Sequence, residues 1–187
     1  MRQVQTERLE LVPVELRNAR ELWSVLQQPN LREFQDIPRV SIDEFERQVR
    51  ARPRTLASGA VGRFEWLIRR RDTGGAIGWV SLRIHDRSRQ HAELGYSLIA
   101  SARRKGYASE ALAALVDEAF AVSDLNELHA CTIPENEASR RVLDRVGFDE
   151  SRLLHGGALI RNRRVDIVLY VYTRARYLAR MRERVVG

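Results

Sequence analysis

The stretch AELGYSLIASARRKGYASEAL, residues 92–112, combines the pattern of a strand, a basic turn that contains glycine, and the start of a helix. Over residues 92–98 the side chains alternate between an apolar set, Ala92, Leu94, Tyr96 and Leu98, and a second set, Glu93, Gly95 and Ser97. Such alternation is typical of a strand with one buried face, and it predicts a strand over residues 92–99. Glu93 is therefore expected to point away from the apolar face.

A long amphipathic helix is expected after the turn. Its apolar stripe recurs at helical spacing and consists of Leu112, Leu115, Val116, Ala119 and Phe120. The acidic residues Glu110, Asp117 and Glu118 are expected on the other side of this helix. A turn that opens a helix leaves several backbone N–H groups unpaired at the positive end of the helix dipole.

The turn over residues 103–108 is therefore a candidate phosphate site. Gly106 permits a close approach of the backbone, small Ala108 leaves room behind it, and Ser109 offers a hydroxyl at the helix start. A plain surface turn that begins a helix would contain the same residues. Both interpretations stay open on this evidence alone.

The rest of the chain predicts strands and helices on both sides of this stretch. Strands are expected over residues 8–12, 64–70, 76–85, 127–133 and 165–173, and helices over 15–28, 41–50 and 137–146. Ser41 and Glu44 are expected to form a capping box, and residues 72–75 a tight hairpin. Strand runs mixed with single crossover helices imply an α/β (α+β) fold, in which helices flank a mixed sheet. One domain is expected over residues 1–187, with its core at 6–174 and an arginine-rich tail, 175–187, that extends a helix or frays.

Composition indicates an ordinary globular protein with a basic surface. The chain has 32 Lys and Arg against 25 Asp and Glu, a net charge of +7, and arginine suits phosphate oxygens. No aromatic stacking motif accompanies this charge, so no specific nucleic acid is expected as a partner. Cys131 is the single cysteine, which excludes an internal disulfide and fits a reducing compartment. No signal peptide or apolar run of ~18 residues is present, so we expect a soluble cytoplasmic protein without a membrane partner.

Four ordered motifs resemble the GNAT-type N-acetyltransferases. Arg103, Gly106 and Ala108 occupy the defining positions of the cofactor motif of that family, Arg/Gln-x-x-Gly-x-Gly/Ala. The segments AELGY (92–96), GYASEA (106–111), NEASRRVL (136–143) and GF (147–148) resemble the branch that acetylates N-terminal residues, such as alanine, of ribosomal proteins. With TERL at 6–9 and VDIVLY at 165–170, the resemblance covers residues 6–174. It implies the GNAT fold, a mixed and mostly antiparallel central sheet flanked by helices, with acetyl-CoA as the cofactor and CoA as the product.

The resemblance also implies which residues hold the cofactor. The pyrophosphate is expected on the turn and the helix start, namely on Arg103, Arg104, Lys105, Gly106, Tyr107, Ala108 and Ser109. Ile99, Ala100, Asn136 and Ser139 are expected along the pantetheine arm and thioester, with a backbone donor for the carbonyl oxygen at Ala100. Arg104 stands where relatives frequently have glycine, and a positive φ there would cost about 1 kcal/mol.

Amide formation needs a group that orients or deprotonates the amine and a group that stabilises the departing thiolate. Many family members place a tyrosine acid seven residues after Asn136, but Leu143 occupies that position here and cannot donate a proton. The resemblance therefore gives the acid role to Ser139, with Asn136 near the pantetheine arm or the sulfur. Both residues could instead only cap the helix. Glu93 is the candidate that orients or deprotonates the amine through a water. Alternatively, Glu93 is a surface carboxylate paired with an arginine.

The other chemically reactive side chains are not expected to take part. The histidines His85, His91, His129 and His155 show no spacing typical of a metal site, so no metal is expected. Cys131 is expected to be a small buried hydrophobe rather than a nucleophile. Direct transfer within a ternary complex is therefore expected.

The acceptor is expected to be a primary amine, and the resemblance favours the N-terminus of a protein such as a ribosomal protein. Residues 28–62 are expected to build its pocket. With Phe34, Phe45, nearby Trp66 and several arginines, this region favours an acidic or partly aromatic acceptor over a polycation such as spermidine. Two alternatives stay open, an acetyltransferase for a small-molecule amine (an antibiotic or a metabolite) and a non-catalytic acyl-CoA-binding module. The resemblance also allows a homodimer.

Overall fold

The computed structural model describes residues 1–32, 39–86 and 90–186, and one eight-stranded sheet runs through them. The strands are β1 (Val4–Gln5), β2 (Leu9–Pro13), β3 (Gly62–Arg70), β4 (Ala76–Ile84), β5 (His91–Leu98), β6 (Glu127–Thr132), β7 (Asp149–Ile160) and β8 (Arg163–Thr173). Their order in the sheet is β1-β2-β3-β4-β5-β6-β8-β7. The β5–β6 pair is parallel and the other neighbouring pairs are antiparallel. The predicted mixed, mostly antiparallel sheet is confirmed.

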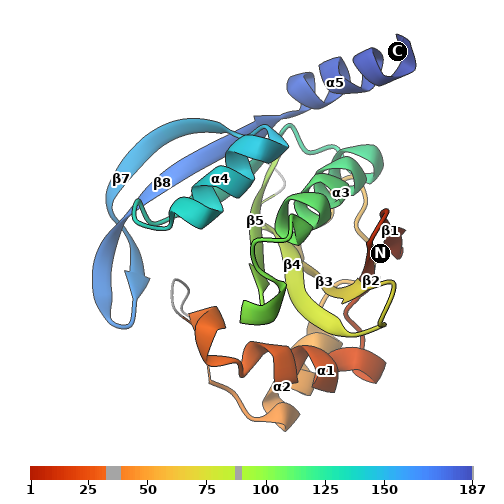
Figure 1. Ribbon diagram of the computed structural model, residues 1–187, viewed down its shortest axis with the longest axis vertical. Helices are drawn as coiled ribbons and strands as arrows, with labels where there is room; N and C mark the ends of the chain where they lie inside the picture. Colours follow the sequence, from red (N-terminus) through yellow and green to blue (C-terminus); the bar gives the residue numbers. More distant parts are fainter. Residues whose placement is uncertain (33–38, 87–89, 187) are drawn as a thin grey trace.

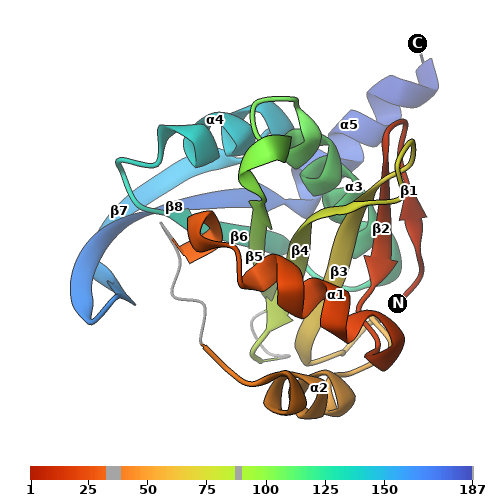
Figure 2. The same ribbon diagram turned by 60° about the horizontal axis from the view of Figure 1, so that its bottom comes forward.

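Helices cover both faces of this sheet (Figures 1 and 2). They are α1 (Leu16–Leu26), α2 (Ile42–Ala51), α3 (Tyr107–Val122), α4 (Glu137–Val146) and α5 (Arg174–Val186). Helices α3 and α4 lie on one face, and α1 and α2 lie on the other. Each layer has its own apolar cluster, because α1 and α2 pack with Leu67 and Trp79, whereas α3 packs with the opposite face of the same strands.

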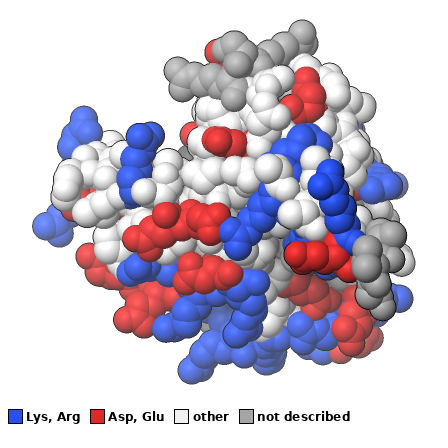
Figure 3. Space-filling view, turned by 90° about the horizontal axis from the view of Figure 1, so that it is seen from above, with Lys and Arg blue, Asp and Glu red and all other residues white. Residues whose placement is uncertain are grey.

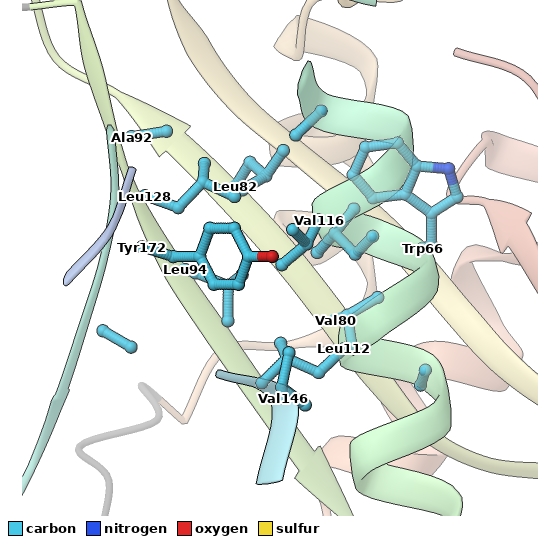
Figure 4. Close-up of a cluster of buried hydrophobic side chains, with 14 of the residues drawn as sticks. Trp66, Val80, Leu82, Ala92, Leu94, Leu112, Val116, Leu128, Val146 and Tyr172 are labelled. Carbon is cyan, nitrogen blue, oxygen red and sulfur yellow. The ribbon is translucent and has the colours of Figure 1, made fainter. Parts of the chain in front are cut away.

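The larger core forms around the apolar stripe that the sequence predicts for α3. Leu112 and Val116 are fully buried and lie among side chains of β3, β4, β5 and β6 (Figure 4). These partners are Trp66, Val80, Leu82, Leu94 and Leu128. Because α3 follows β5 directly, this packing fixes the turn between them against the sheet.

The polar side of α3 differs from the prediction at one position. Glu118 was expected to face away from the core but is only 4% exposed, because Arg2 of the N-terminal segment covers it with a 2.6 Å ion pair. Glu110 is half-buried and binds Arg8, and Asp117 binds Arg180. Helical periodicity places a charge off the apolar stripe, but it does not show which distant segment will cover that charge.

Two strands were not expected from the sequence. β1 is only two residues long, which is too short for an alternating pattern. β7 has no fully buried residue. Its partly buried positions, Leu154, Gly156, Ala158 and Ile160, alternate with exposed positions that include Leu153 and Leu159, so its sequence shows no clear alternation of apolar and polar residues. It pairs with β8 at the edge of the sheet with two register shifts, one of which spans Gly156 and Gly157.

The predicted turn and cap chemistry is only partly confirmed. Gly74 adopts φ +69° in the β3–β4 hairpin, as the hairpin prediction requires. Ser41 caps α2 by accepting a hydrogen bond from the backbone N–H of Glu44 at 3.2 Å. The side chain of Glu44 binds Arg47 and Gln48 instead of returning to Ser41, so the capping box predicted here is wrong. A reciprocal box is present at the start of α1 instead.

The arginine-rich tail forms α5, which projects from the body of the molecule (Figure 1). Its first turn is nevertheless tied to the core. Arg174 donates to the backbone carbonyls of Phe120, Ser123 and Leu125 at 2.6–2.9 Å. The ring of Tyr177 stacks on Phe120 with a centroid separation of 5.3 Å. The packed core therefore extends beyond residue 174.

The surface is basic but mixed in sign. On the face shown in Figure 3, Lys and Arg side chains lie beside Asp and Glu side chains. Among the described helices, none combines the length and the apolar character needed to cross a membrane. The described residues also contain no cluster of His, Cys, Asp and Glu suited to a metal ion.

The aromatic residues proposed for the acceptor pocket lie elsewhere. Trp66 is fully buried in the core, where its indole N–H donates to the carbonyl of Arg2 at 3.1 Å. Phe45 is 4% exposed and packs between α2 and α1. Phe34 lies outside the described residues. Trp66 and Phe45 therefore stabilise the two cores.

Candidate active site

The parallel strands β5 and β6 stop pairing halfway along β5. Their register runs from His91↔Glu127 to Leu94↔Ala130, whereas β5 stays paired with β4 as far as Leu98. Over residues 95–98 the edge of β5 that faces β6 therefore has no strand partner within the described chain. Backbone N–H and C=O groups on such an edge are available to an extended ligand.

A cavity of about 670 Å³ lies beside this edge and is bounded by β5, the turn before α3, and α4. It brings together most of the cofactor residues predicted from the sequence, namely Ala100, Arg103, Arg104, Gly106, Tyr107, Ala108, Ser109, Asn136 and Ser139. Ile99 and Lys105 do not line it. The N–H of Ile99 donates to the carbonyl of Ile77 at 2.9 Å, and the carbonyl of Lys105 accepts from Arg8 at 3.0 Å.

The turn has the backbone geometry of an anion site. Arg104 has φ +61° and Gly106, the N-cap of α3, has φ +82°. Arg104 therefore adopts the positive φ whose cost the sequence analysis considered. The first bond inside α3 runs from the N–H of Glu110 to the carbonyl of Gly106, so the preceding N–H groups have no helical acceptor. A Cβ at Gly106 would meet the guanidinium of Arg8 at 3.2 Å, closer than ordinary van der Waals contact, and no other atom within 4 Å.

Positive side chains line the cavity from two sides. Arg103 and Arg104 come from the turn, and Arg141 and Arg145 come from α4. The sequence analysis missed Arg141 and Arg145, although their spacing of four residues places both on one side of a helix. Arg141 binds Glu137 at 2.9 Å. This donor set, with the open turn, fits the phosphates of a CoA molecule.

The other end of the cavity holds a small hydroxyl cluster. Asn136 caps α4 by accepting from the N–H of Ser139 at 3.1 Å. The hydroxyl of Ser139 lies 2.8 Å from the hydroxyl of Tyr96, which comes from β5. Asn136 and Ser139 therefore form the predicted cap contact, and both also line the cavity. Leu143 is fully buried and does not reach the cavity.

Tyr96 is a site residue that the sequence analysis placed only on the apolar face of its strand. Its ring packs against the core, and its hydroxyl reaches the cavity wall. Burial raises the pKa of Tyr96 to about 12, although the hydrogen bond with Ser139 acts in the opposite direction. The phenol is therefore protonated at neutral pH. Alternation alone could not reveal it, since a tyrosine among apolar residues usually reports a core position.

Glu93 lies on the opposite face of β5 and does not line the cavity. It is exposed, as predicted, and its carboxylate lies 3.0 Å from Nε2 of His85. In the sheet it stands next to Arg83, which in turn pairs with Arg63. Glu93 thus faces the side of the sheet from which an acceptor could approach the β5–β6 gap.

Cys131 was expected to be buried, and this prediction is wrong because its side chain is exposed. Leu128, Ala130 and Thr132 take the buried side of β6, which leaves Cys131 on the other face. Partial desolvation by neighbouring atoms and, less strongly, the negative charge of Glu93 raise the pKa of the Cys131 thiol. A protonated thiol is a poor nucleophile, which agrees with direct transfer.

Comparisons with known proteins agree with this geometry. An N-acetyltransferase of Bacillus licheniformis named "Uncharacterized N-acetyltransferase p20" is 27% identical over 178 residues, 95% of this chain and 99% of that protein. The Bacillus subtilis protein named "Putative ribosomal N-acetyltransferase YdaF" is 32% identical over 97 residues, 52% of this chain and 53% of that protein. The structure of RimL, a ribosomal L7/L12 α-N-protein acetyltransferase solved with coenzyme A, has the same fold, with a TM-score of 0.78, 18% identity, and coverage of 92% of this chain and 98% of that one.

A match to a protein family covers the site itself. Residues 8–149 match the acetyltransferase (GNAT) domain family, and this range includes the turn, the β5–β6 gap and the Asn136–Ser139 segment. The chain therefore belongs to the GNAT family of N-acetyltransferases, which use acetyl-CoA as the acetyl donor.

Proposed function

We propose that this enzyme transfers the acetyl group of acetyl-CoA to the N-terminal amine of a protein or peptide. The observation that carries the proposal is the cavity that joins the anion-binding turn to Ser139 at the β5–β6 gap. The protein N-terminus is favoured by the motif resemblance and by the name of the 32% identical relative YdaF.

Charges on the face of β5 opposite the cavity support an acceptor with one positive amine. Arg63, Arg83 and Glu93 lie in one register row, in which Arg83 is the direct neighbour of Glu93 and Arg63 is paired with the buried Glu65 at 2.7 Å. A single ammonium group can approach Glu93, whereas a polyamine would bring further positive charge close to the arginines. Acidic or neutral groups next to the amine fit this row better.

The proposed roles follow from position. The turn at residues 103–109 holds the pyrophosphate on backbone N–H groups, with the arginines of the cavity nearby. Glu93, through a water, accepts a proton from the ammonium so that the neutral amine can attack. A C–N bond then forms, the C–S bond breaks, and the sulfur leaves with the electron pair. Ser139 donates a hydrogen bond to that sulfur. The attacking nitrogen gives up a second proton as the neutral amide forms, and the sulfur takes up one proton to leave as a thiol.

A thiol-release screen tests the proposal. Peptides with varied N-terminal residues are compared with the same peptides blocked by Nα-acetylation, and with spermidine and an aminoglycoside. We expect acetyl-CoA-dependent thiol release only with free N-termini, and mass spectrometric fragmentation should place the acetyl group on the α-amine. Thiol release with the small amines alone would contradict the assignment of a protein N-terminus.

A further inference from the structure

We propose that Tyr96 is a positioning residue whose hydroxyl holds that of Ser139, so that the Ser139 proton points toward the departing sulfur. The inference rests on the role proposed above for Ser139. It extends that role, because it adds a residue of the strand β5 to the groups that stabilise the leaving sulfur. The helix α4 would otherwise supply these groups alone.

The contact joins two elements that converge on the cavity. Tyr96 and Ser139 are 43 residues apart, and their hydroxyl oxygens are 2.8 Å apart. Tyr96 packs against the core, and Tyr96 and Ser139 both line the cavity. A phenol held by its ring has few alternative positions, so it can restrict the rotation of a serine hydroxyl that would otherwise turn freely.

The contacts between Tyr96 and Ser139 allow two arrangements of their hydroxyl protons. The Tyr96 hydroxyl also lies 3.2 Å from the backbone carbonyl of Ser139, to which it can donate. In that arrangement the Ser139 hydroxyl donates its hydrogen bond to the oxygen of the Tyr96 hydroxyl. When Tyr96 donates to the Ser139 hydroxyl oxygen instead, the Ser139 proton is released toward the cavity. The Ser139 carbonyl can accept a hydrogen bond from a backbone N–H within α4, so it keeps a hydrogen-bond partner when Tyr96 donates elsewhere.

An electron-rich sulfur selects the second state. A thiolate accepts hydrogen bonds and offers none, so it favours the arrangement in which Ser139 donates outward and Tyr96 donates to Ser139. The burial that raises the pKa of Tyr96 to about 12 keeps the phenol protonated across the range in which an acetyltransferase works. Tyr96 therefore remains a donor, and a chain of two hydroxyls polarises its terminal proton more than one alone.

A double-mutant cycle tests the coupling. We expect Tyr96→Phe to lower kcat by about tenfold and to change the KM for acetyl-CoA by less than about twofold. This pattern is typical of the loss of a contact that is made only in the transition state. Ser139→Ala is expected to lower kcat by at least about tenfold, and adding Tyr96→Phe to it should have no further effect. Multiplying effects in the double variant would overturn the inference, since Tyr96 would then act without Ser139.

A matched control removes a hydroxyl outside the cavity. Tyr172→Phe makes the same chemical change in a side chain that is 1% exposed in the core, and it should leave kcat unchanged within about twofold. If Tyr96→Phe instead lowers only the melting temperature and leaves kcat per folded molecule unchanged, Tyr96 is a structural residue and the inference is wrong.

A second readout does not require acetyl transfer. A donor hydrogen bond to the bound sulfur lowers the pKa of the CoA thiol, which is about 8.5 for an unperturbed thiol, so the wild-type protein should bind CoA more tightly as the pH rises. We expect calorimetry to show about fivefold tighter binding at pH 9 than at pH 6.5, and less than about twofold in Tyr96→Phe. Equal pH dependence in both proteins would overturn the inference. If no peptide in the screen were acetylated but the two proteins still differed in the pH dependence of CoA binding, only the proposed acceptor would be refuted.

Discussion

Gly106 combines a positive φ with a place in the cavity wall at the start of α3, so a substitution there changes the turn and the cavity together. We predict that Gly106→Val nearly abolishes acetyl-CoA binding, because a branched residue at this φ displaces the unpaired N–H groups at the start of α3. The strain of a branched residue at φ +82° should cost about 1–2 kcal/mol of folding stability. Isothermal titration with acetyl-CoA measures the first effect and thermal unfolding the second.

Gly74 supplies the control for this strain. It has φ +69° and no atom within 4 Å of an added Cβ, and it lies in the β3–β4 hairpin rather than in the cavity wall. Gly74→Val should therefore lower stability to a similar degree and leave acetyl-CoA affinity unchanged. Near-normal binding by Gly106→Val would contradict the pyrophosphate assignment.

Glu93 tests the other side of the reaction. We predict that Glu93→Gln lowers kcat/KM for the amine by at least about tenfold with unchanged acetyl-CoA affinity, because the amide cannot take up the proton of an ammonium group. Glu127→Gln is the matched control. Glu127 lies on the neighbouring strand and binds His129 at 2.7 Å, much as Glu93 binds His85, so it reports the loss of a carboxylate–histidine pair alone. Equal kinetics of both variants would mean that Glu93 is a surface carboxylate.

Elements with a buried apolar face could be predicted from the sequence, and those without one could not. The stripe of α3 and the alternation of β5 are visible because each packs against the core, whereas β7 is only partly buried and has leucines on its exposed side as well. The same limit applies within the site. The turn motif predicted most of the residues that line one end of the cavity, but the contact of Tyr96 with Ser139 depends on how α4 lies across β5, which no local pattern encodes.

The element α5 offers a prediction about stability. Arg174 donates three hydrogen bonds to backbone carbonyls at and just after the end of α3. We predict that Arg174→Ala lowers the free energy of unfolding by about 2–3 kcal/mol, since hydrogen bonds to charged groups are worth more than neutral ones. Arg182→Ala, an exposed change on the same helix, should have an effect below about 0.5 kcal/mol. Urea unfolding of both variants measures the difference, and equal midpoints would show that α5 docks without Arg174.

At the scale of the whole molecule, a net charge of +7 attracts any acidic acceptor, so local recognition must be separated from general attraction. We predict that peptides with an acidic second residue are acetylated with a kcat/KM about fivefold higher than peptides with lysine there, because Arg83 lies next to Glu93 in the sheet. About 1 M salt, where the Debye length is about 3 Å, should remove most of this preference. Arg83→Gln should reduce it at low salt, whereas Arg182→Gln, which changes the net charge by the same amount on α5, should not. An equal loss in both variants would assign the preference to the overall charge of the protein. A preference for lysine at the second position would contradict the recognition of acidic N-termini by Arg83 beside Glu93.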